Sequence, residues 1–178
     1  MSKDIAKQAA SKPPMDPIAE ARRQWEHHGW ADAAGGMSVV TTLVRANQIV
    51  TAMVEVALAP SGLSFARFEI LRLLGFSRAG ELPMGKIGAR LQVHPASVTS
   101  AVKRLERDGL VGRRVGVTDS RVVLASITTQ GRDVVGRATD AINAVFRRLD
   151  EEGIAIEDLT RLLNRIRWLA GDAVSGFE

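Results

Sequence analysis

The chain has 178 residues, of which 46% are hydrophobic and 25% are charged, which fits one globular domain or a small domain with helical extensions. Cysteine is absent, so a disulfide framework, a thiolate nucleophile and a Cys-ligated metal are excluded. No apolar run approaches the roughly 20 residues of a membrane span, and the N-terminus lacks the apolar stretch of a secretory signal. We therefore expect a soluble cytoplasmic protein without a membrane partner.

The positive charge is concentrated in the middle of the chain. Residues 61–128 contain 11 Lys and Arg against 5 Asp and Glu, a net charge of +6, whereas the whole chain carries +4. A localised basic patch favours a polyanionic partner. The alternative on charge alone is an ordinary solvated surface of mixed charge.

The N-terminal part is expected to be helical after a flexible tail at residues 1–15. A first helix is predicted from Asp16 to about Asp32, with Gly35 and Gly36 breaking the chain after it. A second, apolar helix is predicted at residues 38–59, where hydrophobic side chains cover more than one stripe. This second helix is expected to be buried on two sides, by its own fold and by a partner. Residues 16–60 are thus predicted to form an N-terminal helical segment for dimerisation that could also cover a ligand.

Residues 61–128 alternate short helices with strand-like stretches. Ser64 is expected to cap a helix, Pro83 to open a short helix ending at residue 91, and Pro95 to open another that runs to about Asp108. Gly109 stops that helix. Two β-type stretches around residues 118–119 then predict a hairpin at 110–127.

The C-terminal segment, residues 129–178, is expected to hold two long helices. Thr128 can cap the first, at residues 129–152, and the second, at 156–174, has a strong 3.6-residue period of apolar side chains. The predicted fold class is therefore mainly α with a small β-hairpin wing.

Two short helices joined by a tight turn and followed by a hairpin are the parts of a winged helix-turn-helix, whose second helix enters the DNA major groove. Within the helix at 95–108, one stripe is apolar and the outer face carries small hydroxyl and basic side chains, which can meet phosphates and base edges. Arginines of the wing can enter the minor groove, and Asp119 could orient the guanidinium of Arg121. The candidate DNA-binding residues are Pro95, Ser97, Thr99, Ser100, Lys103, Arg104, Arg113, Arg114, Asp119 and Arg121.

The stretch from Leu63 to Gly131 resembles the MarR family of bacterial transcription regulators. It contains "SVTSAVKRLERDGLVGRR", a D-x-R in the wing and a "TTQG" entry to the next helix. The matching residues are Thr99, Arg104, Leu105, Gly109, Leu110, Arg113, Asp119, Arg121, Thr128 and Gly131. The chain departs from the family pattern in a short wing tip, in Ser120 where many members carry a base, and in 36 residues before the first long helix.

The resemblance implies a homodimeric repressor built by its N- and C-terminal helices, which reads a pseudo-palindromic operator with half-sites about one helical turn apart. It also implies release from DNA by a small effector, an anionic aromatic compound or an acyl-CoA, and no cofactor or metal. The segment "ARRQWEHHGW" supplies candidate effector contacts. They are Arg22, Arg23, Trp25, His28 and Trp30, and Arg45, which lies outside the segment, is a further candidate. Alternatively, the two tryptophans pack the extra helix onto the dimer core.

The sequence leaves two alternative functions to consider, an enzyme and a protein-binding module. An enzyme has little support, because the adjacent His27 and His28 point to different sides of a helix and no phosphate loop or G-x-S-x-G occurs. A winged-helix module that binds protein without DNA is the remaining alternative, but it would be expected to lose the basic excess at 61–128. Thiol-based redox sensing is excluded by the absence of cysteine.

Overall fold

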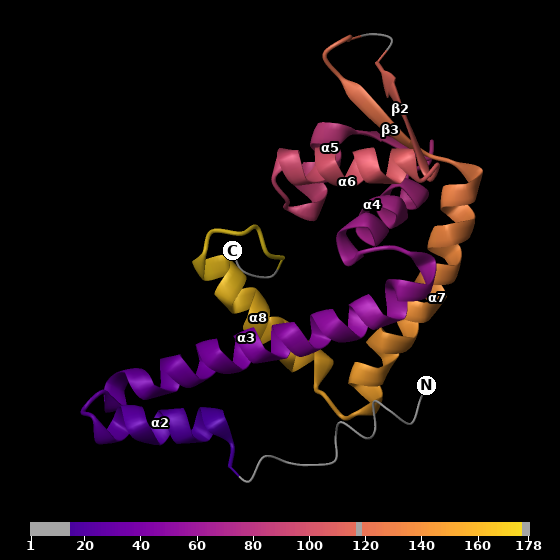
Figure 1. The fold of residues 1–178 in the computed structure, drawn as a ribbon. Helices are drawn as coiled ribbons and strands as arrows, with labels where there is room; N and C mark the ends of the chain where they lie inside the picture. Colours follow the sequence, from indigo (N-terminus) through magenta and orange to yellow (C-terminus); the bar gives the residue numbers. More distant parts are fainter. Residues whose placement is uncertain (1–14, 117–118, 176–178) are drawn as a thin grey trace. The chain divides into compact units, whose positions relative to one another are not determined.

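The computed structural model describes residues 15–116 and 119–175. Most of the flexible tail predicted at 1–15 lies outside these residues, as do the last three positions of the chain. The chain divides into two compact units, residues 1–52 and 53–178, which are described separately. The elements, shown in Figure 1, are α2 (Pro17–His27), α3 (Ala31–Leu58), η1 (Ala59–Ser61), α4 (Phe65–Phe76), β1 (Glu81–Pro83), α5 (Met84–Leu91), α6 (Pro95–Arg107), β2 (Val111–Val115), β3 (Val123–Ile127), α7 (Thr129–Glu151) and α8 (Ile156–Leu169).

The break between the first two helices lies earlier than the sequence predicted. Asp16 caps α2, accepting a hydrogen bond from the Ile18 N–H at 2.9 Å. The turn is made at Gly29, whose φ of +88° is a left-handed conformation that favours glycine. Gly35 and Gly36 lie inside α3, so the prediction that they end a helix was wrong. A glycine inside a helix costs only about 1 kcal/mol relative to alanine, which a long helix tolerates.

One hydrophobic core holds the second unit together. α4, α5 and α6 lie together at the base of the β2–β3 hairpin (Figure 1), and α7 packs against α4. The stripe predicted on α6 is buried as expected, with Val98, Val102 and Leu105 at most 2% exposed. The other core residues are Val54, Leu58, Leu63, Phe68, Ile70, Leu71, Leu74, Ile87, Leu110, Val111, Ala125, Ile127, Val135, Ala138 and Ile142.

The wing is part of a three-stranded antiparallel sheet with strand order β1-β3-β2. The hairpin predicted at 110–127 is present as β2 and β3, which pair with Val111 opposite Ile127. The sequence did not predict β1, whose Glu81 pairs with Ser126. Three residues ending in a proline give too short a pattern to identify a strand.

The ends of α6 and α7 follow the predicted capping chemistry. Pro95 is the first residue of α6, and His94 Nδ1 accepts from the Ala96 N–H at 3.2 Å. Gly109 follows the helix with a φ of +73°. Thr128 caps α7, because its Oγ1 accepts from the Gly131 N–H at 3.0 Å. Ser64 occupies the N-cap of α4 without a side-chain capping bond.

Two helices leave apolar side chains exposed. The helical segment Ala31–Ser61 contains an 18-residue window with a mean hydropathy of 1.2, so it is long and apolar enough to cross a membrane by length and composition alone. One helix of this kind is weak evidence for a membrane span. The last helix also ends earlier than predicted, at Leu169 rather than residue 174. The exposed apolar residues of α3 and α8 include Val39, Val40, Leu43, Val44, Ile49, Val50, Leu159, Leu162, Ile166 and Leu169.

Candidate nucleic-acid interface

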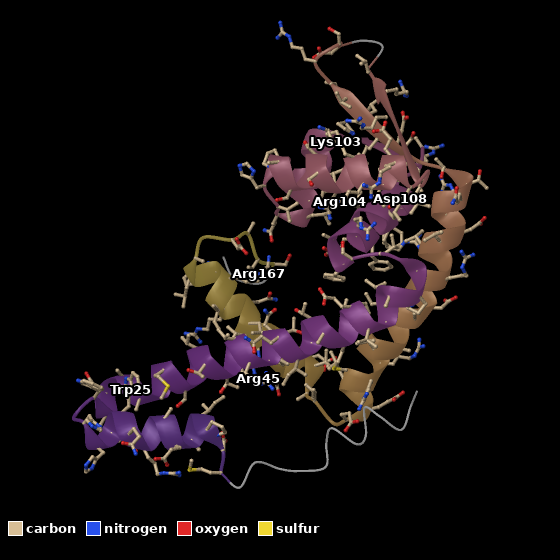
Figure 2. All side chains as sticks on the ribbon, viewed as in Figure 1. Trp25, Arg45, Lys103, Arg104, Asp108 and Arg167 are labelled. Carbon is tan, nitrogen blue, oxygen red and sulfur yellow. The ribbon has the colours of Figure 1, made fainter. Side chains whose placement is uncertain are left out.

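The exposed face of α6 carries the predicted contact residues. While its apolar stripe is buried in the core, the side chains of Ser97, Thr99, Ser100, Lys103 and Arg104 are all solvent-exposed. Figure 2 shows Lys103, Arg104 and Asp108 along this helix. Within residues 15–116 and 119–175, Lys103 and Arg104 form no ion pair. Both cations are therefore free to approach an anionic partner.

Two arginines of the wing are held by carboxylates. Arg113 on β2 donates to Glu106 of α6, with Nε at 2.7 Å and Nη2 at 2.5 Å from the same oxygen. Arg114 donates both Nε and Nη2 to the carboxylate of Glu81 on β1. Such pairs fix the direction of a guanidinium. Arg113 and Arg114 thus fasten the wing to α6 and to β1.

Asp119 acts on the backbone of the wing rather than on a guanidinium. Its Oδ1 accepts from the backbone N–H of Arg121 at 2.9 Å, and the described residues contain no Asp119–Arg121 ion pair. The carboxylate therefore shapes the turn that presents Arg121, whose side chain is exposed. Residues 117–118 of the wing lie outside the described residues.

Arg67 on α4 connects three parts of the domain. Its Nη1 donates to Asp108 at 3.1 Å, its Nη2 to the Gly62 carbonyl at 2.6 Å and its Nε to Ser64 Oγ at 3.4 Å. The side chain is only 19% exposed. Sequence reasoning missed this residue, because its partner Asp108 lies 41 positions away and no local pattern links them. Arg67 fastens the C-terminal end of α6 to the start of α4.

Two grooves that contain hydroxyl or cationic side chains flank α6. The first, of about 460 Å³, is lined by residues of α6 and by the start of α4, including Ser64 and Arg67. The second, of about 570 Å³, lies between α6, the start of α5 and the wing, and we call it the wing groove. Its lining includes Lys86, Thr99 and Arg121. Lys86 was also missed from the sequence, because a single lysine on a short helix carries no distinctive pattern.

The candidate effector residues lie in the first unit and are mostly paired locally. Arg22 forms an ion pair with Glu26, and Arg23 with Glu20. Hydrogen bonds from Gln24 and Arg23 lower the pKa of Glu20. Arg45 donates to Gln48 at 3.3 Å.

The aromatic residues of this segment form a cluster. The Trp25 and Trp30 rings meet edge to face with centroids 5.5 Å apart, and His28 stacks on Trp30 at 6.0 Å. Both tryptophans remain partly exposed. Neither groove that flanks α6 is lined by these residues. No cluster of His, Asp or Glu that could hold a metal occurs in the described part of the chain.

These features define a winged helix-turn-helix domain with a basic, exposed recognition helix. The MarR family model matches residues 63–123. The chain belongs to the MarR family, and this confirms both the resemblance and the predicted fold class. It also makes the chain a transcription regulator rather than an enzyme.

Known proteins of this family cover most of the chain. The crystal structure of Sco5413, a MarR family transcriptional regulator from Streptomyces coelicolor, has 43% identity and a TM-score of 0.69, covering 79% of this chain and 99% of that one. CouR from Rhodococcus jostii RHA1, solved with p-coumaroyl-CoA bound, has 25% identity and a TM-score of 0.64, covering 76% and 94%. The transcriptional repressor Mb2911 of Mycobacterium bovis is 29% identical over 107 residues, 60% of this chain and 76% of the relative.

Proposed function

We propose that the chain is a homodimeric repressor of the cytoplasm that binds a pseudo-palindromic DNA operator through α6 and the wing and is released by a small effector. The observation that carries this proposal is the division of α6 into two faces. The buried stripe fixes the helix on the core, and the opposite face exposes hydroxyl and basic side chains. A rigid helix with this outer face suits the major groove, which admits one α-helix.

The individual contacts follow from the position and freedom of each side chain. Ser97, Thr99 and Ser100 lie near the start of α6 and can reach base edges or phosphates. Lys103 and Arg104 are long and form no ion pair with the residues that the structure describes, so they can reach guanine or the backbone. Arg121 is the wing cation best able to enter the minor groove, because Arg113 and Arg114 are held by carboxylates.

Dimer formation accounts for the exposed apolar faces of α3 and α8. Both helices present several large aliphatic side chains to solvent in a single chain. A helix that exposes several large apolar side chains is typical of an interaction site. A two-fold dimer would cover it and would place two α6 helices for two half-sites.

The effector is proposed to be a small anionic aromatic compound or an acyl-CoA. The relative CouR was solved with p-coumaroyl-CoA, and the cluster of Trp25, His28 and Trp30 offers aromatic faces that stack on a ring or acyl chain. Arg22, Arg23 and Arg45 would hold the anionic group. The binding would shift the dimer to a geometry that no longer fits DNA.

Fluorescence anisotropy tests the DNA-binding proposal. The purified protein is titrated into a duplex from upstream of its own gene and into a scrambled duplex of equal length, at two salt concentrations. Binding that is tighter to the upstream duplex and weakens steeply with salt supports the proposal. No binding to either duplex at low salt would contradict it and favour the protein-binding module.

The effector proposal is tested by release from the same duplex. p-Coumaroyl-CoA and aromatic carboxylates are added to the complex with wild-type protein and with Trp25→Ala and Arg22→Ala variants. The proposal predicts release of the wild type and a weaker response of both variants. Variants that keep the full response would remove these residues from the effector site.

A further inference from the structure

The dimensions of a helix and of the major groove determine which protein groups meet phosphates. The major groove of B-DNA is about 12 Å wide, and an α-helix with its side chains is about 10–12 Å across. A helix seated in the groove therefore has a phosphate backbone close to each of its flanks. Cations beside α6 are therefore placed to contact those backbones, in addition to the long cations on the helix itself.

The wing groove lies on one of these flanks. Its lining combines Thr99 of α6, Arg113 and Arg121 of the wing, and the start of α5 with Lys86. Three cations and no carboxylate belong to its lining. The groove therefore has the charge and the position of a phosphate site.

Among the cations that line this groove, Lys86 is the one that lies on a helix and is not held by a carboxylate of the described residues. Arg113 is bound to Glu106, and Arg121 belongs to the turn of the wing. The side chain of Lys86 is exposed and forms no ion pair within the described ranges, 15–116 and 119–175. Its neighbour Ile87 is fully buried in the core, so α5 holds the position of Lys86 firmly.

In the groove on the other flank of α6, the cation beside the helix is already hydrogen-bonded within the protein. Its partly buried cation, Arg67, already donates to Asp108, Ser64 and the Gly62 carbonyl. The hydroxyls of Ser97 and Ser100, together with Arg104, are the groups it offers. On that side the cation beside α6, Arg67, stabilises the fold. On the wing side the cation beside α6, Lys86, is available to a ligand.

We propose that the wing groove is a binding site for a phosphate of the DNA backbone and that Lys86 is its main contact. This inference rests on the proposed function and extends it to a residue outside the recognition helix and the wing. A phosphate contact carries no sequence information. Lys86 should therefore strengthen binding to all DNA equally and leave the preference for the operator unchanged.

The test is the salt dependence of DNA binding by the full-length protein. Affinity for the upstream duplex and for a scrambled duplex is measured by anisotropy at several NaCl concentrations. The variants are Lys86→Gln, Lys86→Arg, and Arg137→Gln as a charge-matched control on α7 that lines neither groove. Circular dichroism checks that each variant is folded.

Lys86→Gln should flatten the plot of log affinity against log salt by about 0.9 for each protomer bound. At 0.1 M salt, a change of that size in the slope corresponds to about an eightfold loss of affinity for DNA for each phosphate contact removed. The loss should be the same for both duplexes, Lys86→Arg should restore most of it, and Arg137→Gln should behave as the wild type. A wild-type slope in Lys86→Gln would overturn the site alone, whereas a wild type without salt-dependent binding would overturn the proposed function as well.

Discussion

Gly131 offers the sharpest test of how the wing is joined to the rest of the domain. The Thr128 N–H donates to the Leu110 carbonyl at 3.1 Å and Thr128 Oγ1 donates to the Gly109 carbonyl at 2.9 Å. This brings the first turn of α7 against the segment between α6 and β2. A Cβ on Gly131 would overlap the Leu110 carbonyl oxygen and lie 2.9 Å from Ile127 Cγ1. The position has no room for any side chain.

The size of the effect follows from two opposing contributions. Overpacking costs about 1–3 kcal/mol, and the upper value applies because a backbone carbonyl cannot rotate away. Alanine recovers about 1 kcal/mol of helix propensity. Gly131→Ala should therefore lower the free energy of unfolding by about 2 kcal/mol. At Gly136, in the same helix, no atom lies within 4 Å of the position that a Cβ would take. Gly136→Ala should therefore raise the free energy of unfolding by up to about 1 kcal/mol.

Urea denaturation followed by circular dichroism measures both variants against the wild type. The protein concentration must be the same throughout, because the stability of a dimer depends on it. Opposite signs for the two glycines are the expected result. Equal stability of Gly131→Ala and the wild type would refute the reasoning that Leu110 and α7 meet at this point.

Three further predictions concern charged residues of the second unit. Arg67→Ala should lower the free energy of unfolding by about 0.5–1.5 kcal/mol, because it removes the hydrogen bonds to Asp108, Ser64 and the Gly62 carbonyl, and Arg67→Lys should not restore it; denaturation that matches the wild type would argue against this network. Glu106→Gln frees Arg113 and removes a negative charge from the C-terminal end of α6, so it should tighten DNA binding several-fold in anisotropy titrations; weaker binding would show that the pair positions Arg113 for DNA. Burial raises the pKa of Glu69 above its usual 4.5, so the folded state binds this proton more tightly than the unfolded state. The resulting stability is present below about pH 4.5 and lost as pH rises through the folded pKa, so Glu69→Gln should gain urea resistance relative to the wild type between about pH 4 and pH 7; a difference independent of pH would contradict this.

The recognition unit could be predicted because its signals are local. Pro95 at the first turn, Gly109 after the last and an apolar residue every third or fourth position define α6 within 15 residues. The cap of α7 could also be predicted from the sequence, because Thr128 and the Gly131 N–H that it accepts from are only three residues apart.

The features that sequence reasoning missed depend on contacts between distant segments. Arg67 gains its role only when folding brings Asp108 beside it. β1 forms because β3 provides a strand with which it can pair. The proposed role of Lys86 depends on a groove that folding creates between this residue and the wing. Gly35 and Gly36 misled the helix prediction, since helix propensity is a weak preference that a long helix overrides.

Hydroxyl-radical footprinting on the upstream duplex tests the central claim most directly. The account predicts protection on one face of the DNA at two half-sites about 10 base pairs apart, as expected for two α6 helices related by a two-fold axis. The same lanes should show the protection fading as salt is raised. Absence of any footprint at protein concentrations that saturate binding, or uniform protection without half-sites, would contradict the account.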